Sequence, residues 1–497
     1  MALTLDRNGD IAAALAQHRP GLLVDASGPF QHYGARPYRV AEACIEAKVH
    51  YLDLADSREF VVGIGALDAA ARAAGIVLLS GVSTLPALSF AALREIARDL
   101  RPEIVTIGIA PSPFAGIGLN VIRGLGAYAG RSVPVGPRRS ARALIDARRL
   151  VVAPPGALPL HPRRFLLCDT PDLALLPRRW PSLTSFWVGA GTLPTWLQRC
   201  ASLAAWLVRL RLLPSLAPFA RLYHWFSRRL RRGEHRGGMI VAVTANGMER
   251  SWHLIGEGDS GPWIPSMAAA AVVQRMLSGK APPPGARPAT DDLELADFAP
   301  FFDQHGIVTG TRERRSGGPL YRRILGADFE RLPAPIQQVH SLDGRHELRG
   351  TATVERGRSL PSRLVGRLIG LPRAGVDLPA RVVISASPAG ETWARSIGGG
   401  RFRSQLREGT GGEAHLLVER FGLATMTIAL VREGERLAYV VRGWRFCGLP
   451  MPRRLAPHGR TFESAEDGRF RFDVEIMLPL VGLLARYRGT LETSGRP

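Results

Sequence analysis

The sequence predicts an α/β protein with an incomplete parallel sheet, an α+β middle domain and a mostly antiparallel, curved or barrel-like β domain. Three observations carry this expectation. Residues 1–100 alternate short apolar runs with helical patterns, which is typical of a parallel sheet with right-handed crossovers. Beyond residue 319, short strand-like runs are joined by glycine-containing turns, which indicates antiparallel pairing. The length of 497 residues exceeds one hydrophobic core, so we expect several domains.

The first domain, residues 1–100, alternates strands and helices. Asp10 is the expected N-cap of its first helix, and Gly75 the expected glycine after its last helix. The patterns predict helices over residues 11–18, 39–47 and 66–74, and strands over residues 22–26, 50–55 and 76–80.

The middle domain, residues 101–310, is expected to shape a substrate cleft or a dimer contact. Residues 104–110 (IVTIGIA) alternate as a strand does. An apolar helix over residues 265–278 is expected to pack back on the first domain.

Residues 196–232 form a basic, aromatic segment that Pro214 and Pro218 divide into two short helices. One interpretation is a pair of helices that lies on an anionic membrane surface, with aromatic rings inserted and arginines at the lipid phosphates. The other is an amphipathic pair that packs on the same chain or on a homodimer mate. The aromatic residues of the segment include Trp196, Trp206, Tyr223, Trp225 and Phe226.

The third domain, residues 319–495, follows a charged, glycine-ended linker over residues 311–319. Two short helices are expected, over residues 320–325 and 360–369. Strands are expected over residues 346–356, 381–387, 391–397, 401–407, 414–421, 425–432, 436–447, 469–477 and 483–492.

The net charge of +22 does not by itself indicate nucleic-acid binding. All but two of the 65 basic residues are arginine, and they are spread over the whole chain without a recognition motif. The four cysteines lie far apart in sequence, which disfavours a metal site or a disulfide framework and suits a reducing cytoplasm. No secretory signal and no apolar run of membrane-spanning length is visible, so we expect a cytoplasmic protein, with peripheral membrane attachment left open.

Three stretches, DASGPF, ACIEAKVHYLDLADSREF and LLSGVSTLPALS, resemble the second half of the NADP-binding domain of saccharopine dehydrogenase-like reductases. RRFLLCDTPDLALLP, SLTSFWVGAG and WHLIGEGDSGPWIPSM are similar to the substrate domain of the same family. The resemblance covers residues 1–300, with Lys48 where the family usually has glycine. It implies a Rossmann-type sheet, NADP as cofactor and hydride transfer on a small metabolite.

No glycine-rich phosphate loop precedes the strand at residues 22–26, although the family has a GxGxxG unit before it. Residues 1–6 match the end of the family's third strand. Either the start codon is assigned too far downstream, or the domain is decayed or completed by a partner. Without that unit the strand gains an open edge, and we expect the reductase activity to be impaired in this chain.

Site residues follow from the resemblance. The backbone of Ala26, Ser27, Gly28, Pro29 and Phe30 would line the nicotinamide-ribose side of the cofactor, whereas an ordinary exit from a strand is the alternative.

Two carboxylates, Asp53 and Asp56, lie near the end of the next strand and could orient a substrate or exchange protons. Their alternative roles are a helix N-cap or a salt bridge with Arg58. The catalytic proton donor stays unassigned, since His224, His235 and His253 are candidates by residue type only.

The third domain resembles a family of unknown function that is often fused behind such reductases, through LYRRILGADFERLP, GETWARSIGGGRFRS and YVVRGWRFCGLPMP. A curved sheet of this kind can enclose a lipid-like ligand, and Trp393, Phe402, Trp444 and Phe446 could line that cavity. A packed core is the alternative. The sequence therefore favours an NADP-dependent oxidoreductase, with a non-catalytic lipid- or metabolite-binding protein as the second hypothesis.

Overall fold

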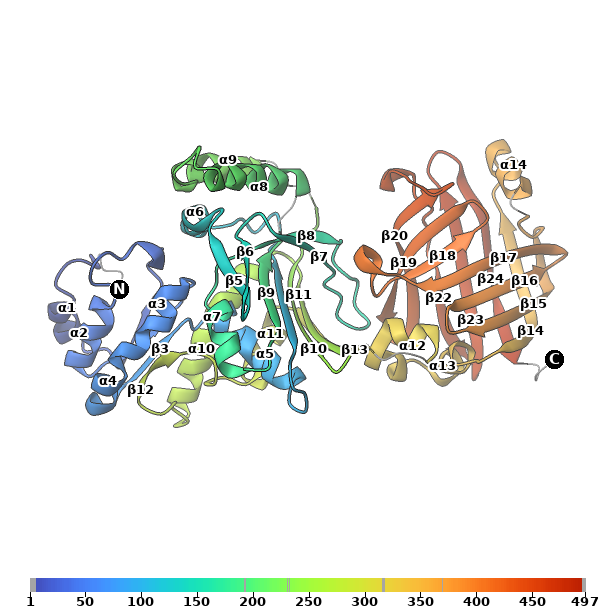
Figure 1. The fold of residues 1–497 in the computed structure, drawn as a ribbon. Helices are drawn as coiled ribbons and strands as arrows, with labels where there is room; N and C mark the ends of the chain where they lie inside the picture. Colours follow the sequence, from blue (N-terminus) through green and yellow to red (C-terminus); the bar gives the residue numbers. More distant parts are fainter. Residues whose placement is uncertain are drawn as a thin grey trace. The chain divides into compact units, whose positions relative to one another are not determined.

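The computed structural model describes residues 6–191, 194–229, 231, 233–314, 318–368 and 370–493. The chain divides into two compact units (Figure 1). Unit 1 comprises Met1–Leu150 and Arg163–Thr309, and unit 2 comprises Val151–Pro162 and Gly310–Pro497. The expected match of residues 1–6 to a strand end lies almost wholly outside the described residues. The α/β class is confirmed.

Unit 1 begins with a four-stranded parallel sheet in the order β1–β2–β3–β12. Its last strand comes from far along the chain and pairs with β3, whereas β1 forms the opposite edge. Helix α1 precedes β1, α2 connects β1 to β2, and α3 and α4 connect β2 to β3. The bounds are β1 Leu22–Asp25, β2 His50–Asp53, β3 Val77–Ser80, β12 Gly285–Pro288, α1 Ile11–His18, α2 Arg39–Ala47, α3 Arg58–Gly63 and α4 Asp68–Ala74.

The expected capping residues occupy their places. The Asp10 carboxylate accepts a hydrogen bond from the backbone N–H of Ala13 at 2.9 Å, and Gly75 adopts the left-handed conformation after α4. The last helix begins later than expected, because a 3₁₀ turn precedes it (η2, Ile64–Leu67).

Two strands end earlier than the apolar pattern predicts, because an aspartate at each end turns the chain. The Asp25 carboxylate accepts hydrogen bonds from the backbone N–H and the hydroxyl of Ser27. The Asp53 carboxylate accepts a hydrogen bond from the backbone N–H of Ala55 at 3.0 Å. Such aspartate turns release the backbone from a sheet.

Unit 1 also contains a seven-stranded mixed sheet, in the order β13–β11–β10–β4–β9–β8–β7, and a two-stranded antiparallel sheet of β5 (Ser132–Gly136) and β6 (Arg139–Arg142). Strand β4 (Ile104–Ala110) pairs in parallel with β9 (Ser185–Ala190) and antiparallel with β10. The other bounds are β7 Ala147–Leu150, β8 Arg163–Leu167, β10 Gly237–Ala245, β11 Met248–Gly256 and β13 Ile307–Arg314.

Seven helices accompany this sheet among the described residues. The long apolar helix α10 contacts η3 (Thr84–Leu88), a turn that directly follows the parallel strands, and α8 and α9 occupy the basic, aromatic segment. Their bounds are α5 Ser89–Ile96, α6 Leu119–Tyr128, α7 Asp172–Arg179, α8 Thr195–Arg209, α9 Ala220–Arg229, α10 Ile264–Leu277 and α11 Leu295–Gln304.

In the expected linker, Thr311–Arg314 belongs to β13, and residues 315–317 lie outside the described residues. Residues 151–162, which we expected in the middle domain, belong to unit 2. There the carbonyl of Gly156 accepts from the N–H of Arg432 at 2.9 Å, and that of Pro159 from the guanidinium of Arg442 at 2.9 Å.

Unit 2 is an antiparallel β-barrel, which confirms the barrel-like expectation. Ten of the described strands follow one another around the ring, and β19–β20 pairing joins its two arcs. The bounds are β14 Arg345–Arg356, β15 Gly375–Ser387, β16 Gly390–Ile397, β17 Gly400–Glu408, β18 Leu417–Phe421, β19 Ala424–Glu433, β20 Arg436–Phe446, β22 Phe462–Glu466, β23 Arg469–Leu478 and β24 Gly482–Thr493.

Helices α12 (Leu320–Leu325) and α13 (Ala334–His340) lie at one end of the barrel (Figure 1). Apolar side chains of both helices belong to the buried core of the barrel. The His340 imidazole is 2.6 Å from the Glu463 carboxylate and stacks on Tyr321, with ring centroids 3.6 Å apart. Leucine, isoleucine, valine and aromatic residues from the strands surround this polar pair.

Leu348→Ala is expected to lower the free energy of unfolding of unit 2 by about 2–5 kcal/mol, because Leu348 is fully buried in the barrel and the substitution leaves a cavity. The matched control Leu480→Ala, at a side chain that is 97% exposed, should change it by less than about 0.5 kcal/mol. Urea unfolding followed by tryptophan fluorescence measures both. Equal effects would contradict a packed interior.

Candidate functional site

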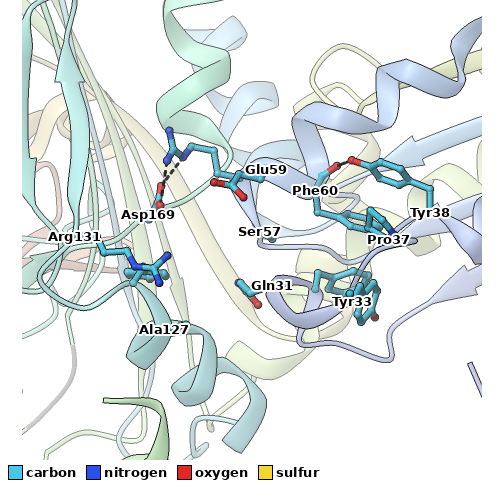
Figure 2. A pocket seen from close by; sticks show the side chains of 14 residues that line it. Gln31, Tyr33, Pro37, Tyr38, Ser57, Glu59, Phe60, Ala127, Arg131 and Asp169 are labelled. Atoms are coloured by element: carbon cyan, nitrogen blue, oxygen red, sulfur yellow. Dashed lines mark hydrogen bonds and ion pairs between the residues drawn. The ribbon is translucent and has the colours of Figure 1, made fainter. Parts of the chain in front are cut away.

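A pocket of about 430 Å³ lies in unit 1 beside the carboxyl ends of β1 and β2 (Figure 2). Ligands of open α/β sheets bind outside strand ends of this kind. Segments after β1 and β2 form one side, and residues next to α6 and β8 form the other. The lining consists of Phe30, Gln31, Tyr33, Gly34, Pro37, Tyr38, Ser57, Arg58, Glu59, Phe60, Ala127, Tyr128, Arg131 and Asp169.

Four aromatic rings form a packed wall. The Phe30 ring lies 4.8 Å from that of Tyr33 and 5.1 Å from that of Phe60, between centroids. The Tyr38 hydroxyl donates to the carbonyl of Phe60 at 2.8 Å. Burial raises the pKa of Tyr33 to about 12, so its phenol stays protonated at neutral pH.

The other lining groups are charged. Arg58 forms an ion pair with Asp169, whose nearest atoms are 2.7 Å apart. Burial raises the pKa of Asp169, and the Arg58 guanidinium opposes this shift. Arg131 and Glu59 are exposed to the pocket, and neither has an ion-pair partner among the described residues. The pocket therefore offers one uncommitted cation and one uncommitted anion.

Only Phe30 of the five residues expected at the nicotinamide side lines this pocket. Ser27 is engaged by Asp25, and its hydroxyl also lies 2.8 Å from the Tyr33 hydroxyl. The carbonyl of Gly28 accepts from the Asn120 amide at 3.2 Å. The turn thus supports the aromatic wall from behind, and Ala26 and Pro29 lie within it.

Asp53 is placed away from solvent and Asp56 beside the pocket. Asp53 is fully buried, and one carboxylate oxygen accepts from Ala55, from the Ser80 hydroxyl and from the N–H of Gly81. It holds the ends of β2 and β3 together and is neither a helix cap nor a partner of Arg58. Asp56 accepts from the Gln31 amide at 3.0 Å and so fixes a lining side chain.

The four aromatic residues proposed for a barrel cavity separate into two groups. Trp393 and Phe402 are buried in the barrel core. Trp444 is half-buried and donates to the carbonyl of Pro452, whereas Phe446 is 46% exposed. None of the four lines the cavity of about 200 Å³ that unit 2 has between β14, β23 and β24.

The three histidines that are candidates for the proton donor do not line the pocket. The His235 imidazole stacks on Phe114 and lies 2.7 Å from the Asp259 carboxylate, His253 is buried beside Ser251, and His224 lies in α9. Among the described residues, no group of three or more histidine, cysteine, aspartate or glutamate side chains could hold a metal ion.

Arg131, Glu59 and Asp169 were missed as site residues. Asp169 lies within the stretch RRFLLCDTP, whose family resemblance was the available signal, and Glu59 lies within DSREF. Arg131 follows the glycine-rich residues 116–130, which by themselves predict no site.

The comparison with protein families concerns the C-terminal part of the chain. Residues 332–491 match the model of a family described as "Domain of unknown function (DUF4166)". The C-terminal part of the chain is thus similar to a family of unknown function, as its motifs suggested. No curated protein matches the chain.

Two solved structures are similar to the chain, each at 13% sequence identity. One is apo histidine-tagged saccharopine dehydrogenase (L-Glu forming) from Saccharomyces cerevisiae, with a TM-score of 0.42 over 63% of this chain and 89% of that chain. The other is an amine dehydrogenase from Mycobacterium smegmatis, with a TM-score of 0.29 over 57% of this chain and 78% of that chain. Both are dehydrogenases by their names.

The described residues do not fit the pyrophosphate of a dinucleotide, which needs backbone N–H groups at a helix N-terminus after the strand. Strand β1 leads into a turn and a single 3₁₀ turn instead. A GxGxxG spacing does occur between β11 and α10, at Gly256–Gly261. There the Asp259 carboxylate accepts from Ser112, and Glu257 pairs with Arg236, so two negative charges oppose a phosphate.

Asp53 makes the stability of unit 1 depend on pH. Burial raises its pKa from 3.8 to about 7, although the hydrogen bonds from Gly81, Ala55 and Ser80 lower it. Between these two values the folded chain holds a proton that the unfolded chain has lost. Stability therefore falls as pH rises through this window, and levels off above it.

Asp53→Asn is expected to remove this contribution, which amounts to at most about 1.4 kcal/mol per pH unit. Urea midpoints at several pH values measure the slope. Asp172, whose pKa burial also raises to about 7, supplies a matched variant, and Asp172→Asn should remove a further part of the slope. An unchanged slope in Asp53→Asn would contradict the buried, protonated carboxyl.

Proposed function

We propose that unit 1 binds a small metabolite that carries both a carboxylate and an amine, in the pocket between Arg131 and Glu59. The observation that carries the proposal is the pair of uncommitted opposite charges in one pocket at the carboxyl ends of β1 and β2. The volume of about 430 Å³ lies within the range of small-molecule sites.

Each group has a role that its chemistry supports. The Arg131 guanidinium would bind the carboxylate through two parallel hydrogen bonds. Glu59 would bind the ammonium, and Asp169 adds negative charge that Arg58 holds in place. The aromatic wall excludes water on the side of Phe30, Tyr33 and Phe60, which strengthens both ionic contacts.

Hydride transfer with NADP, which the family resemblance implies, is not assigned to this pocket, because the described residues do not fit the pyrophosphate of a dinucleotide. A non-catalytic lipid-binding role for unit 2 has less support, since Trp393 and Phe402 are packed into the barrel core.

Arg131→Gln is expected to weaken binding of α-amino acids about tenfold to hundredfold, because a charge-assisted hydrogen bond to the carboxylate is lost. Calorimetry with the full chain and a panel of α-amino acids, their α-hydroxy acid analogues and the corresponding amines measures this. The control Arg138→Gln removes an exposed arginine that does not line the pocket. Binding that is equal in Arg131→Gln and the unmodified chain overturns the proposal.

The full chain is expected to bind NADP(H) weakly, since the described residues lack a seat for the pyrophosphate. Calorimetric titration with NADPH, and separately with nicotinamide mononucleotide, measures this. We expect neither nucleotide to bind tightly, because a single 3₁₀ turn, and no helix N-terminus, follows β1. Tight, NADPH-specific binding would contradict this account of the turn.

A further inference from the structure

Helices α8 and α9 present large apolar side chains to solvent at the periphery of unit 1 (Figure 1). Leu203 is 66% exposed, and Leu210 and Leu212 are 60% and 68% exposed. The exposed apolar residues of this segment, called the α8–α9 face below, are Trp196, Leu203, Trp206, Leu210, Leu212, Phe219, Leu222, Trp225 and Phe226.

Helix α8 buries two polar side chains while it exposes several large apolar ones. Its buried side chains are Leu197, Gln198, Ser202 and the small Ala205, whereas two tryptophans and a leucine of the same helix are exposed. The amide oxygen of Gln198 and the hydroxyl of Ser202 are buried without a hydrogen-bond partner. A globular helix normally buries its apolar stripe. Packing within this chain therefore does not account for the outward face.

The charge of the segment has one sign. Residues 195–233 contain eight arginines, and no aspartate or glutamate occurs between Leu173 and Gly233. No ion pair involves the arginines of α8 or α9 among the described residues. The Arg209 guanidinium lies 4.4 Å from the ring centre of Trp206, and that of Arg229 lies 4.9 Å from that of Trp225.

We propose that the α8–α9 face docks the protein on the surface of an anionic lipid bilayer. Tryptophan, phenylalanine and leucine would enter the headgroup region, and the arginines would lie at the lipid phosphates. Pairs of tryptophan and arginine suit this boundary, where one end is apolar and the other is charged. Attachment would be peripheral, since no described helix has the length and apolarity to cross a bilayer.

Two other occupants fit the face less well. A second copy of the chain would bring two unpaired arginine clusters together, and like charges at an interface are unfavourable. A nucleic acid would match the charge but would bury wide apolar surface against a polar partner, because such interfaces are more polar than those between proteins. An anionic bilayer matches both the charge and the apolar side chains.

Flotation of the full chain with vesicles tests the proposal. We expect the chain to float with vesicles of phosphatidylcholine and phosphatidylserine at low ionic strength, and to float less at high ionic strength or with phosphatidylcholine alone. Leu203→Gln/Trp206→Gln should lower the partition coefficient at least about tenfold. Arg228→Gln/Arg229→Gln should lower it about fivefold per arginine.

A matched variant tests whether the loss of flotation is specific to the α8–α9 face, rather than a result of removing any exposed leucine. Leu277→Gln/Leu480→Gln changes exposed leucines elsewhere, at side chains that are 83% and 97% exposed, and should float as the unmodified chain does. Absence of flotation at low ionic strength overturns the proposal, as does equal loss in the control. The proposal is also overturned if light scattering gives the mass of a dimer and Leu203→Gln/Trp206→Gln returns it to that of a monomer. The same holds if the chain shifts DNA in a gel but does not float with vesicles.

Discussion

The carboxylate of Asp53 holds together the edge of the sheet on which the pocket is built. Three donors meet one of its oxygens, and they come from the turn after β2 and from the end of β3. Buried polar groups of this kind are stabilising only when their hydrogen bonds are made. Because the turn that Asp53 fixes leads directly into Ser57–Phe60, the lining of the pocket depends on a residue that never touches a ligand.

The same constraint explains what could be predicted from the sequence. Apolar runs located the three early parallel strands, and an N-cap and a C-terminal glycine located the ends of helices. The strand ends were misplaced because Asp25 and Asp53 bend the chain through their side chains, while the apolar pattern continues for one or two residues. The charged wall of the pocket could not be derived from residue patterns. Arg131 and Asp169 are 72 and 110 residues from Glu59 in the sequence, and only the tertiary structure brings them into the same pocket.

The barrel shows where alternation succeeds and where it fails. Strands such as β16 and β17 were predicted because their apolar and polar residues alternate. Strand β22 (FESAE) was not, because its inward residue is Glu463, which is stabilised by His340 of the equally unpredicted α13. Trp444 and Phe446 lie at the end of β20, where Trp444 is half-buried and Phe446 is exposed. Residue type and alternation therefore predict which face of a strand a side chain occupies. How deeply that side chain is buried in the barrel depends on the tertiary structure.

The net charge of +22 has different consequences in different parts of the chain. In the barrel, arginines are paired with carboxylates. Glu347 pairs with Arg349 of its own strand and with Arg381 of the neighbouring strand, and Arg486 pairs with Asp473 across strands. Hydrogen bonds from both arginines lower the pKa of Glu347 to about 2, so these charges are compensated locally over the whole neutral range. In α8 and α9 the sequence supplies no carboxylate, and exposed tryptophan and leucine accompany the arginines. An excess of arginine spread over a chain says little about partners, and the arginines of α8 and α9 differ from the rest because they accompany exposed apolar side chains without acids nearby in the sequence.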